Sequence, residues 1–234
     1  MGTDVEPSDE GGVITAHHYK PTEIHQAAAA ARKQKKRRYG IAARLLFLTL
    51  DLIYGNKSTL EKFRILEVVA RVPYQAWEQV AFVAVTHTHE DPSFARRVHD
   101  RALLARTQQD NELFHLLIVE ELLDSRTFNR SAIRGRFLPQ LLAFAYYHLS
   151  WILYVARPQL SFGLNADFED HAMHTYLAYV DDHPDLAEQT WVSQFKAEYG
   201  DYRTVADVLT SMALDEQHHR DESVALIEAA RFGQ

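Results

Sequence analysis

The chain of 234 residues contains no cysteine. Disulfide bonds, thiolate metal ligands and a cysteine nucleophile are therefore excluded, so any bound metal must be held by histidine and carboxylate side chains. Neither of the two apolar stretches, 41–48 and 138–156, is suited to spanning a membrane, and Gln140, His148 and Ser150 interrupt the second. Strand signatures and internal repeats are nearly absent as well, which predicts an all-helical chain.

Basic residues are outnumbered by acidic ones, 25 against 32, and the net charge is -7. Because a phosphate backbone is bound through clustered Lys and Arg, this balance disfavours nucleic acid as a partner. The acidic N-terminus has neither the apolar core of a signal peptide nor the Arg-rich character of a transit peptide, so export is not expected. We expect a flexible segment over 1–23 and a single domain over 24–234.

Capping and turn residues divide the chain into long helices. Ser58 is expected to cap the second of them, and Asp91 followed by Pro92 predicts the N-cap and first turn of the third. The expected helices are 24–54 with an interruption near Gly40, 58–89, 92–124, 133–155, 164–180, a short one after 184, and 204–232.

Two of these helices carry the same E-x-x-H motif. Glu112 and His115 lie in the third helix, and Glu216 and His219 lie in the last. Because residues three apart share a helical face, each pair can bind one metal ion from one side. One such motif arises easily by chance, but both lie in apolar stretches, where an unpaired carboxylate is costly to bury. Two copies therefore indicate a dinuclear metal centre.

A dinuclear carboxylate bundle needs one further glutamate from each of two other helices. In the second helix Glu67 lies among apolar residues, and Glu78 is its rival because eleven residues are close to three helical turns. In the fifth helix Glu169 competes with Asp170, and Tyr176 returns to the face of Glu169. Helical phase alone leaves both choices open.

Four segments resemble motifs of the alternative oxidase family, including the plastid terminal oxidases, in the family's order. ILEVVARVP at 65–73 is similar to LETVAAVP, NELFHLL at 111–117 to NERMHLL, FEDHAMHTY at 168–176 to LEEEAIHSY, and DEQHHRD at 215–221 to DEAHHRD. A looser resemblance extends from about Tyr39 to Ser223. It implies an all-α, ferritin-like four-helix bundle with a dinuclear metal centre and additional N-terminal and interfacial helices.

Matched residue by residue, the resemblance selects Glu67 over Glu78 and Glu169 over Asp170. The implied cofactor is two iron ions per chain. The six implied ligands are Glu67, Glu112, His115, Glu169, Glu216 and His219. Tyr176 falls on the tyrosine that the family keeps beside its iron pair, and the resemblance implies that it is catalytic.

Four more residues form the expected cofactor-binding set. Asn111 and Asp215 each precede an E-x-x-H glutamate and are expected to hydrogen bond to the ligating histidines, with ordinary helix-surface polarity as the alternative. Lys62 and Leu66, just before Glu67, complete the set on the resemblance. Spacing assigns no metal-binding role to three neighbouring histidines: His171, His174 and His218.

The sequence departs from the family pattern at three places. Residues 169–171 read Glu-Asp-His where the family has three glutamates, and Lys62 and Ala213 stand where the family has arginines. Since arginine offers a planar bidentate fork and lysine only a point charge, these changes concern the quinol site more than the metal ligands.

The resemblance implies a diiron quinol oxidase that passes electrons from quinol to dioxygen and forms water without proton pumping. A soluble diiron oxygenase or hydroxylase that uses the same ligands on another substrate is the alternative, with the altered third motif as its support. An iron-storage bundle ranks last, because ferritins lack the four motifs.

A basic cluster at 32–38 leads directly into the apolar residues 41–48, a pattern that suits a helix in the headgroup region of an anionic membrane. Leu45, Leu46 and Phe47 are the expected inserting side chains. Packing into the core or a dimer interface is the alternative for this stretch and for 138–156. Because alternative oxidases are monotopic and dimeric, we expect a peripheral membrane homodimer, on the cytoplasmic face of a bacterial inner membrane, with the mitochondrial inner membrane as the other possibility.

Overall fold

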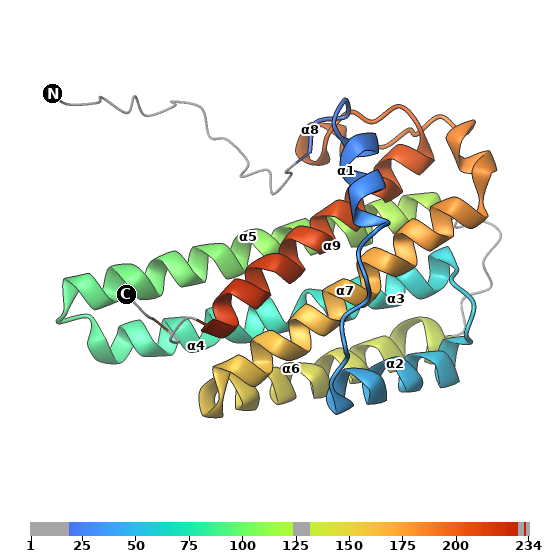
Figure 1. The fold of residues 1–234 in the computed structure, drawn as a ribbon. Helices are drawn as coiled ribbons and strands as arrows, with labels where there is room; N and C mark the ends of the chain where they lie inside the picture. The colour runs from blue at the N-terminus through green and yellow to red at the C-terminus, as the bar shows by residue number, and fades with distance from the viewer. Residues whose placement is uncertain (1–18, 124–131, 229–231, 233–234) are drawn as a thin grey trace, which may run out of the picture.

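The computed structural model describes residues 19–123, 132–228 and 232 (Figure 1). Within these ranges the chain is helical and forms no strand; Thr190 and Thr204 make an isolated bridge. The predicted all-α class is confirmed. The expected flexible segment falls largely on residues 1–18, and the expected end of the last helix falls beyond 228, so both lie outside the described residues.

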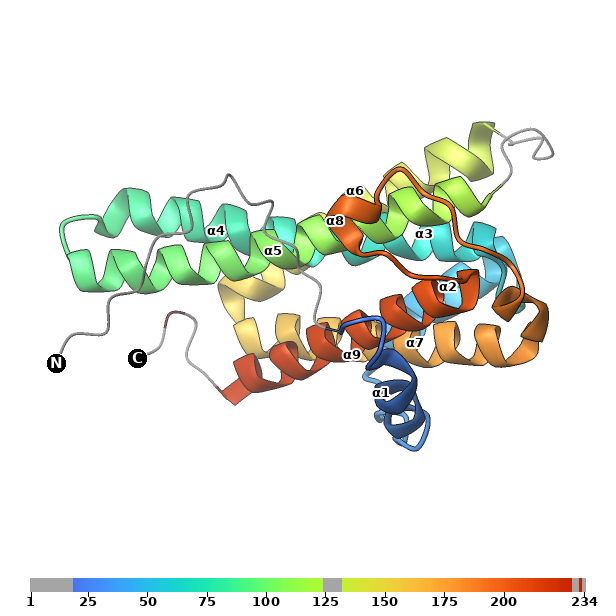
Figure 2. The same ribbon diagram turned by 90° about the horizontal axis from the view of Figure 1, so that it is seen from above.

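The helices surround the candidate metal centre in two layers. In chain order they are α1 (Ile24–Ala31), α2 (Ile41–Tyr54), α3 (Leu60–Ala70), α4 (Val72–Thr88), α5 (Pro92–Leu122), a π-helix (Ile133–Phe137), α6 (Leu138–Ala156), α7 (Pro158–Asp182), a 3-10 helix (Pro184–Ala187), α8 (Lys196–Tyr199) and α9 (Val205–Glu228). One layer holds α3, α4 and α5, and the other holds α7 and α9 (Figure 2). Helices α2 and α6 lie along one edge, and α1 packs on α9 (Figure 1).

The first expected helix is two helices, separated by a non-helical segment at residues 32–40. Gly40 is the N-cap of α2, and its backbone N–H donates a hydrogen bond of 2.7 Å to Asp167 on α7. The backbone N–H of Arg37 donates one of 3.0 Å to Asp170, which also accepts a hydrogen bond from the Tyr39 hydroxyl. The expectation of a brief interruption was wrong because these two carboxylates satisfy polar groups of the segment that a helix would otherwise have paired.

The second expected helix is divided at Arg71 into α3 and α4. Pro73 lies in the first turn of α4, where its missing N–H leaves no helical hydrogen bond unmade. The N-cap of α3 is Thr59, whose hydroxyl accepts a hydrogen bond of 3.2 Å from the backbone N–H of Lys62. The prediction of Ser58 as the cap was wrong by one residue.

The predicted start of α5 is confirmed. Asp91 accepts hydrogen bonds of 3.0 and 3.1 Å from the backbone N–H groups of Ser93 and Phe94.

Helix α7 begins at Pro158, earlier than the expected residue 164, because proline fits the first turn of a helix. The short helix α8 was not predicted from the sequence.

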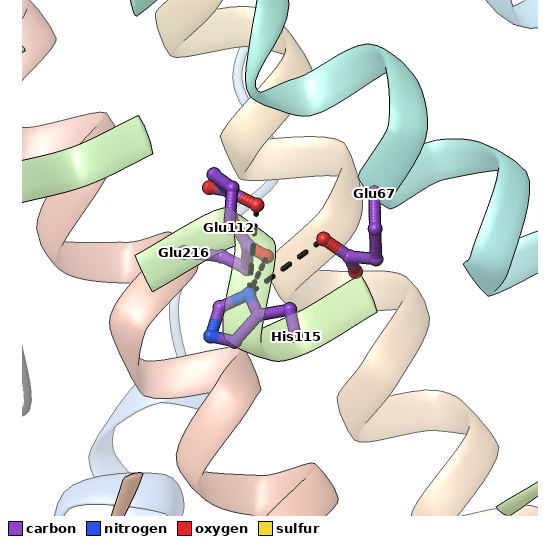
Figure 3. A group of neighbouring side chains, drawn as sticks. All are labelled: Glu67, Glu112, His115 and Glu216. Atoms are coloured by element: carbon purple, nitrogen blue, oxygen red, sulfur yellow. Dashed lines mark hydrogen bonds and ion pairs between the residues drawn. The ribbon is translucent and has the colours of Figure 1, made fainter. Parts of the chain in front are cut away.

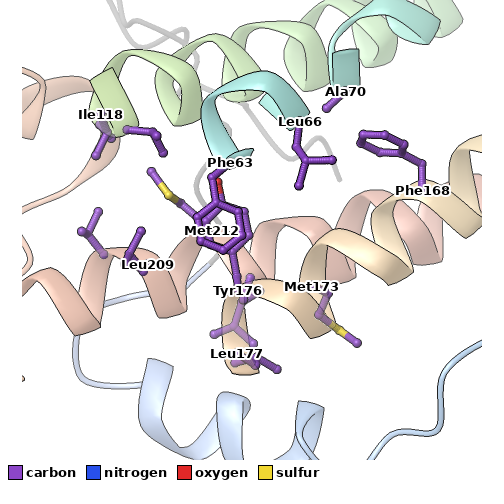
Figure 4. Close-up of a cluster of buried hydrophobic side chains, with 14 of the residues drawn as sticks. Phe63, Leu66, Ala70, Ile118, Phe168, Met173, Tyr176, Leu177, Leu209 and Met212 are labelled. Carbon is purple, nitrogen blue, oxygen red and sulfur yellow. The ribbon is translucent and has the colours of Figure 1, made fainter. Parts of the chain in front are cut away.

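A hydrophobic core between the layers lies beside the candidate centre (Figure 4). It includes Phe63, Leu66 and Ala70 from α3, Ile118 from α5, Phe168, Met173, Tyr176 and Leu177 from α7, and Leu209 and Met212 from α9. The rings of Phe63 and Tyr176 stack with centroids 4.2 Å apart. This packing fixes α3 against α7 and so sets the distance between the two glutamates that these helices carry.

Helix α2 presents an apolar face to the outside of the molecule. Its exposed side chains recur at helical spacing, and they are Ile41, Leu45, Leu48 and Leu52. Phe47 is buried and stacks on His171 with ring centroids 4.0 Å apart, so the expectation that it inserts into a membrane was wrong. Among the described residues, no helix has both the length and the apolar character needed to cross a membrane.

Candidate metal centre

The two E-x-x-H motifs face each other from α5 and α9, and a glutamate on α3 and another on α7 complete the site. The structure thus brings all six predicted ligands together, and each is at most 1 % exposed. Local sequence explains the placement, because Leu66 and Val69 bury α3 on both sides of Glu67, while Met212 and Ala213 bury α9 just before Glu216.

One group of donors gathers around His115 (Figure 3). Its Nδ1 lies 3.6 Å from Oε2 of Glu67, 3.5 Å from Oε2 of Glu112 and 3.2 Å from Oε1 of Glu216. Three carboxylates and one imidazole nitrogen thus converge from three helices on one point, and together they can hold a metal ion.

A second group gathers around His219 and shares two members with the first. His219 Nδ1 lies 2.8 Å from Oε1 of Glu112 and 3.7 Å from Oε2 of Glu216, and Glu169 completes the group. Glu112 and Glu216 therefore each direct one carboxylate oxygen toward His115 and the other toward His219. Two four-donor sites with two shared carboxylates form the arrangement of a dinuclear carboxylate centre.

Four carboxylate oxygens inside the cluster are buried and make no hydrogen bond to any described residue. They are Oε2 of Glu67, Glu112, Glu169 and Glu216. A buried carboxylate oxygen without a hydrogen bond costs on the order of 1–3 kcal/mol. Three of these four lie no closer than 3.5 Å to a histidine nitrogen, so the site can accept a further positive partner. Oxygen and imidazole donors without thiolates suit iron, so the residues present fit a pair of iron ions.

The rival carboxylates lie outside both groups. Glu78 forms an ion pair with Arg106, whose Nε lies 2.9 Å from its Oε1. Asp170 is buried but turned to the other side of α7, where it accepts hydrogen bonds from Tyr39 and Arg220. The geometry therefore supports Glu67 and Glu169 as the metal-facing residues.

Tyr176 touches the cluster without joining either group of donors. Its hydroxyl donates a hydrogen bond to Oε1 of Glu67, and its ring is fully buried against Phe63. Since Oε1 is occupied in this way, Glu67 presents its other oxygen to His115 and the first site.

Asp215 contacts both Asn111 and His115, so Asn111 reaches the histidine through Asp215 and not by the direct bond expected. Asp215 Oδ2 is 3.3 Å from His115 Nε2 and accepts a hydrogen bond of 3.3 Å from Asn111. It also accepts a bond of 2.7 Å from the hydroxyl of Tyr199 on α8, which the sequence did not predict. With Nε2 held by Asp215, His115 directs Nδ1 toward the carboxylates, as a ligating imidazole requires.

A second tyrosine, Tyr74 on α4, was also missed. Its hydroxyl donates a hydrogen bond of 2.6 Å to Oε1 of Glu169. A signal for it was present in the sequence, because Tyr74 follows Glu67 by the same seven residues that separate Tyr176 from Glu169.

Lys62 and Leu66 do not enter the two donor groups. The Lys62 ammonium is buried and donates hydrogen bonds of 2.5 Å to Asp51 and 2.9 Å to the backbone oxygen of Gly55, both at the end of α2. Leu66 is 1 % exposed and packs in the core beside Glu67. Their expected part in quinol binding stays a prediction.

The three additional histidines lie outside both donor groups, as expected for His171 and His218; for His174 the sequence gave no role. His218 Nε2 pairs with Glu222 at 3.1 Å, and His174 Nε2 lies 3.9 Å from Asp170. His171 stacks on Phe47 below α2.

Burial sets the protonation of the cluster. It raises the pKa of Glu67 and of Glu169 well above the usual range of a carboxyl group. Burial also acts against the ionised form of Glu112, but the interactions with His115 and His219 outweigh it and lower that pKa. For His219 burial opposes the charged form, yet the hydrogen bond to Glu112 leads the contributions that raise its pKa to about 10. Cations that enter this site must displace protons.

A family model described as "Alternative oxidase" matches residues 10–227. Ubiquinol oxidase 4, chloroplastic/chromoplastic, of Arabidopsis thaliana is 35% identical over 127 residues, which are 54% of this chain and 33% of that protein. Ubiquinol oxidase, mitochondrial, of Mangifera indica is 28% identical over 127 residues, 49% of this chain and 35% of that protein. The matched part spans about a third of the length of these curated relatives.

Proposed function

The chain belongs to the alternative oxidase family, and we propose that it is a diiron enzyme that oxidises a quinol with dioxygen and forms water without proton pumping. The observation that carries this proposal is the pair of four-donor groups that share Glu112 and Glu216. The names of the two ubiquinol oxidases support quinol as the reductant.

We propose that six residues hold the two iron ions, and that two of the six are shared. Glu67 and His115 would serve one ion, and Glu169 and His219 the other, with Glu112 and Glu216 contacting both. Bound iron would supply the redox chemistry between quinol and dioxygen. Carboxylates suit this task because they can change their mode of binding as the charge of the metal changes.

The surrounding residues orient the donors and exclude water. Asp215, supported by Asn111 and Tyr199, holds His115 with Nδ1 toward the carboxylates. The packed core beside Phe63 keeps bulk water from the cluster, which strengthens electrostatic interactions there. We propose Tyr176 as the catalytic side chain, because it is the buried phenol that reaches Glu67 while remaining outside the donor groups.

The altered third motif does not favour an oxygenase over a quinol oxidase. Asp170 bonds to Tyr39 and Arg220, and His171 stacks on Phe47, so neither substitution changes the donors. The same ligand set is kept, and the family match extends through both segments.

We propose that the exposed face of α2 lies in the headgroup region of an anionic membrane. The apolar side chains Ile41, Leu45, Leu48 and Leu52 point outward together. In the segment that leads into α2, Lys33, Lys35, Lys36 and Arg38 are exposed, and no ion pair ties them to other described residues. Apolar insertion with adjacent positive charge is the combination that binds such surfaces.

Arg37 is not part of this basic surface. Its guanidinium pairs with Asp167 at 3.1 Å and its backbone N–H donates to Asp170, so it holds residues 32–40 against α7. We therefore leave Arg37 out of the proposed basic surface, although it belongs to the basic cluster at 32–38.

We also propose a homodimer, supported by a second group of exposed apolar side chains on α4 and α5: Phe82, Val83 and Leu103. The named relatives are chloroplast or chromoplast and mitochondrial proteins. The expected cytoplasmic face of a bacterial inner membrane stays a prediction.

The test is dioxygen uptake by the iron-loaded protein with a short-chain ubiquinol, measured with and without anionic liposomes. We expect two quinols to be oxidised for each dioxygen, because reduction to water takes four electrons, and no hydrogen peroxide to accumulate. Absence of quinol-dependent uptake under both conditions would overturn the proposal. Uptake that yields peroxide would overturn the proposed product.

A further inference from the structure

Glu67 belongs only to the first donor group and Glu169 only to the second, and each accepts a hydrogen bond from a tyrosine. Tyr74 follows Glu67 by seven residues, and Tyr176 follows Glu169 by seven. Each tyrosine bonds to the other glutamate: Tyr176 donates to Oε1 of Glu67, and Tyr74 donates to Oε1 of Glu169. The cluster is therefore closed by two crossed hydrogen bonds between the layers of the bundle.

In both pairs the tyrosine occupies one carboxylate oxygen and leaves the other for the cluster. Oε2 of Glu67 and Oε2 of Glu169 are buried and accept no hydrogen bond from the described residues. A carboxylate held at one oxygen can rotate little about its terminal bond. Each of these glutamates is thus prepared to offer a single oxygen to a cation.

The two tyrosines differ in how firmly they are held. The Tyr74 oxygen accepts a hydrogen bond of 2.9 Å from Nδ2 of Asn165, and the same amide donates at 3.0 Å to Ser223 on α9. The Tyr74 ring also meets Trp77 and His219 edge to face, with centroids 5.2 and 5.7 Å apart.

At the equivalent place, four residues before Glu67, stands Phe63, which stacks on the ring of Tyr176 and has no polar group to offer its hydroxyl. Tyr74 is therefore anchored by a polar chain from α9, whereas Phe63 gives Tyr176 ring packing and no second hydrogen bond.

We propose that Tyr74 is a positioning residue of the second metal site, which fixes Glu169 as a one-oxygen ligand beside His219 through the chain Ser223, Asn165, Tyr74, Glu169. This inference rests on the proposed function in that it takes the second donor group to hold a metal ion. It assigns the two tyrosines different tasks: Tyr74 sets the affinity and geometry of one site, and Tyr176 takes part in the reaction.

The experiment is a titration of the metal-free full chain with Co²⁺, followed by its visible absorption and by the number of ions bound. For Tyr74→Phe we expect the affinity for one of two ions to fall by about 10- to 100-fold, the usual effect of removing a hydrogen bond that orients a ligand. The absorption of that ion should change as well, because Glu169 is no longer restrained to one oxygen.

Two matched variants delete a phenol hydroxyl elsewhere. Tyr176→Phe removes the corresponding bond to Glu67, which has no anchor like Asn165 behind it, so it should weaken the other ion by a smaller factor than Tyr74→Phe weakens its own. Tyr54→Phe removes a hydrogen bond of 3.1 Å to the backbone oxygen of Arg134, remote from the donor groups, and should leave binding and spectrum unchanged. Asn165→Ala, which loosens Tyr74 without removing it, should weaken the same ion by a smaller factor and serves in place of Tyr74→Phe if that variant does not fold.

The outcomes separate this inference from the proposed function. If the unmodified chain binds fewer than two Co²⁺ ions, the dinuclear centre itself is contradicted. If it binds two, and Tyr74→Phe or Asn165→Ala binds both with unchanged affinity and absorption, only the role of Tyr74 is overturned. A lower unfolding temperature of metal-free Tyr74→Phe with unchanged Co²⁺ binding would show a purely structural role and would also overturn the inference.

Discussion

The hydroxyl of Tyr176 on α7 donates a hydrogen bond to Oε1 of Glu67 on α3. The ring is buried and stacked on Phe63, so the hydroxyl has a fixed place at the edge of the donor cluster. A phenol in this position contacts a carboxylate of the donor cluster and leaves the second oxygen of that carboxylate without a hydrogen bond to the described residues. Such a group can deliver a proton or an electron to the centre without being needed to hold the metal.

Tyr176→Phe should therefore keep both iron ions and slow dioxygen reduction severely, by about a hundredfold or more, the range typical of losing a group that acts in the chemistry. The ring remains to pack on Phe63, so folding should be unaffected. Iron content and quinol-dependent dioxygen uptake are measured on the same preparation. A normal turnover number would reduce Tyr176 to a packing residue.

A second prediction concerns His171, which is packed under α2 against Phe47. Burial is the main cause that lowers the pKa of His171 from 6.5 to about 4, and Lys36 and Lys62 lower it further. The folded chain thus holds this imidazole neutral, whereas the unfolded chain protonates it near pH 6.5. The contribution of His171 to the free energy of unfolding is therefore fully present above pH 6.5. It is lost as the pH falls toward 4, by up to roughly 3 kcal/mol in all.

His171→Phe should remove this pH dependence while keeping a ring against Phe47. The difference in unfolding free energy between the variant and the unmodified chain, both metal-free, should shift in favour of the variant as the pH is lowered from 6.5 to 4. Urea denaturation at a series of pH values measures it. A difference that stays constant over this interval would show that His171 is not buried in its neutral form.

The third prediction separates the two parts of the proposed membrane surface. Neutralising Lys33, Lys35, Lys36 and Arg38 should make the free energy of binding to anionic liposomes less favourable by about 1 kcal/mol for each charge at low salt. This loss, measured by sedimentation, should shrink as salt screens the attraction. Replacing Leu45 and Leu48 by serine should weaken binding at low and high salt alike, because apolar insertion is not screened.

Two controls belong to this experiment. Arg37→Gln should reduce liposome binding much less than neutralising the four exposed residues, since Arg37 is engaged by Asp167. Phe47→Leu should leave binding nearly unchanged, because Phe47 is turned into the core. If the unmodified chain fails to sediment with anionic liposomes at any ionic strength, the membrane proposal is wrong.

Local spacing was enough to predict the residues of the two E-x-x-H pairs, because the i, i+3 relation fixes one face of one helix whatever the tertiary structure. Spacing could not decide between Glu67 and Glu78. The chain breaks at Arg71 between them, so the count of whole helical turns that placed them on one face does not apply. Only the resemblance to the family made that choice.

Residues that reach the site through tertiary contacts could not be predicted. Tyr199 comes from α8, a single short turn with no strong helical pattern, and meets Asp215 only because α8 packs on α5. The segment at residues 32–40 reads as helical in sequence, and its hydrogen bonds to Asp167 and Asp170 on α7 decide otherwise.

The most direct test of the dinuclear centre is the iron content of the purified, reconstituted chain, compared with that of two glutamate variants. We predict two iron ions per unmodified chain. Glu112→Ala removes a carboxylate shared by both donor groups and should abolish iron binding and activity together. Glu78→Ala removes the rival, which is paired with Arg106, and should retain two ions. Full iron occupancy in Glu112→Ala, or loss of iron in Glu78→Ala, would contradict the assigned ligand set.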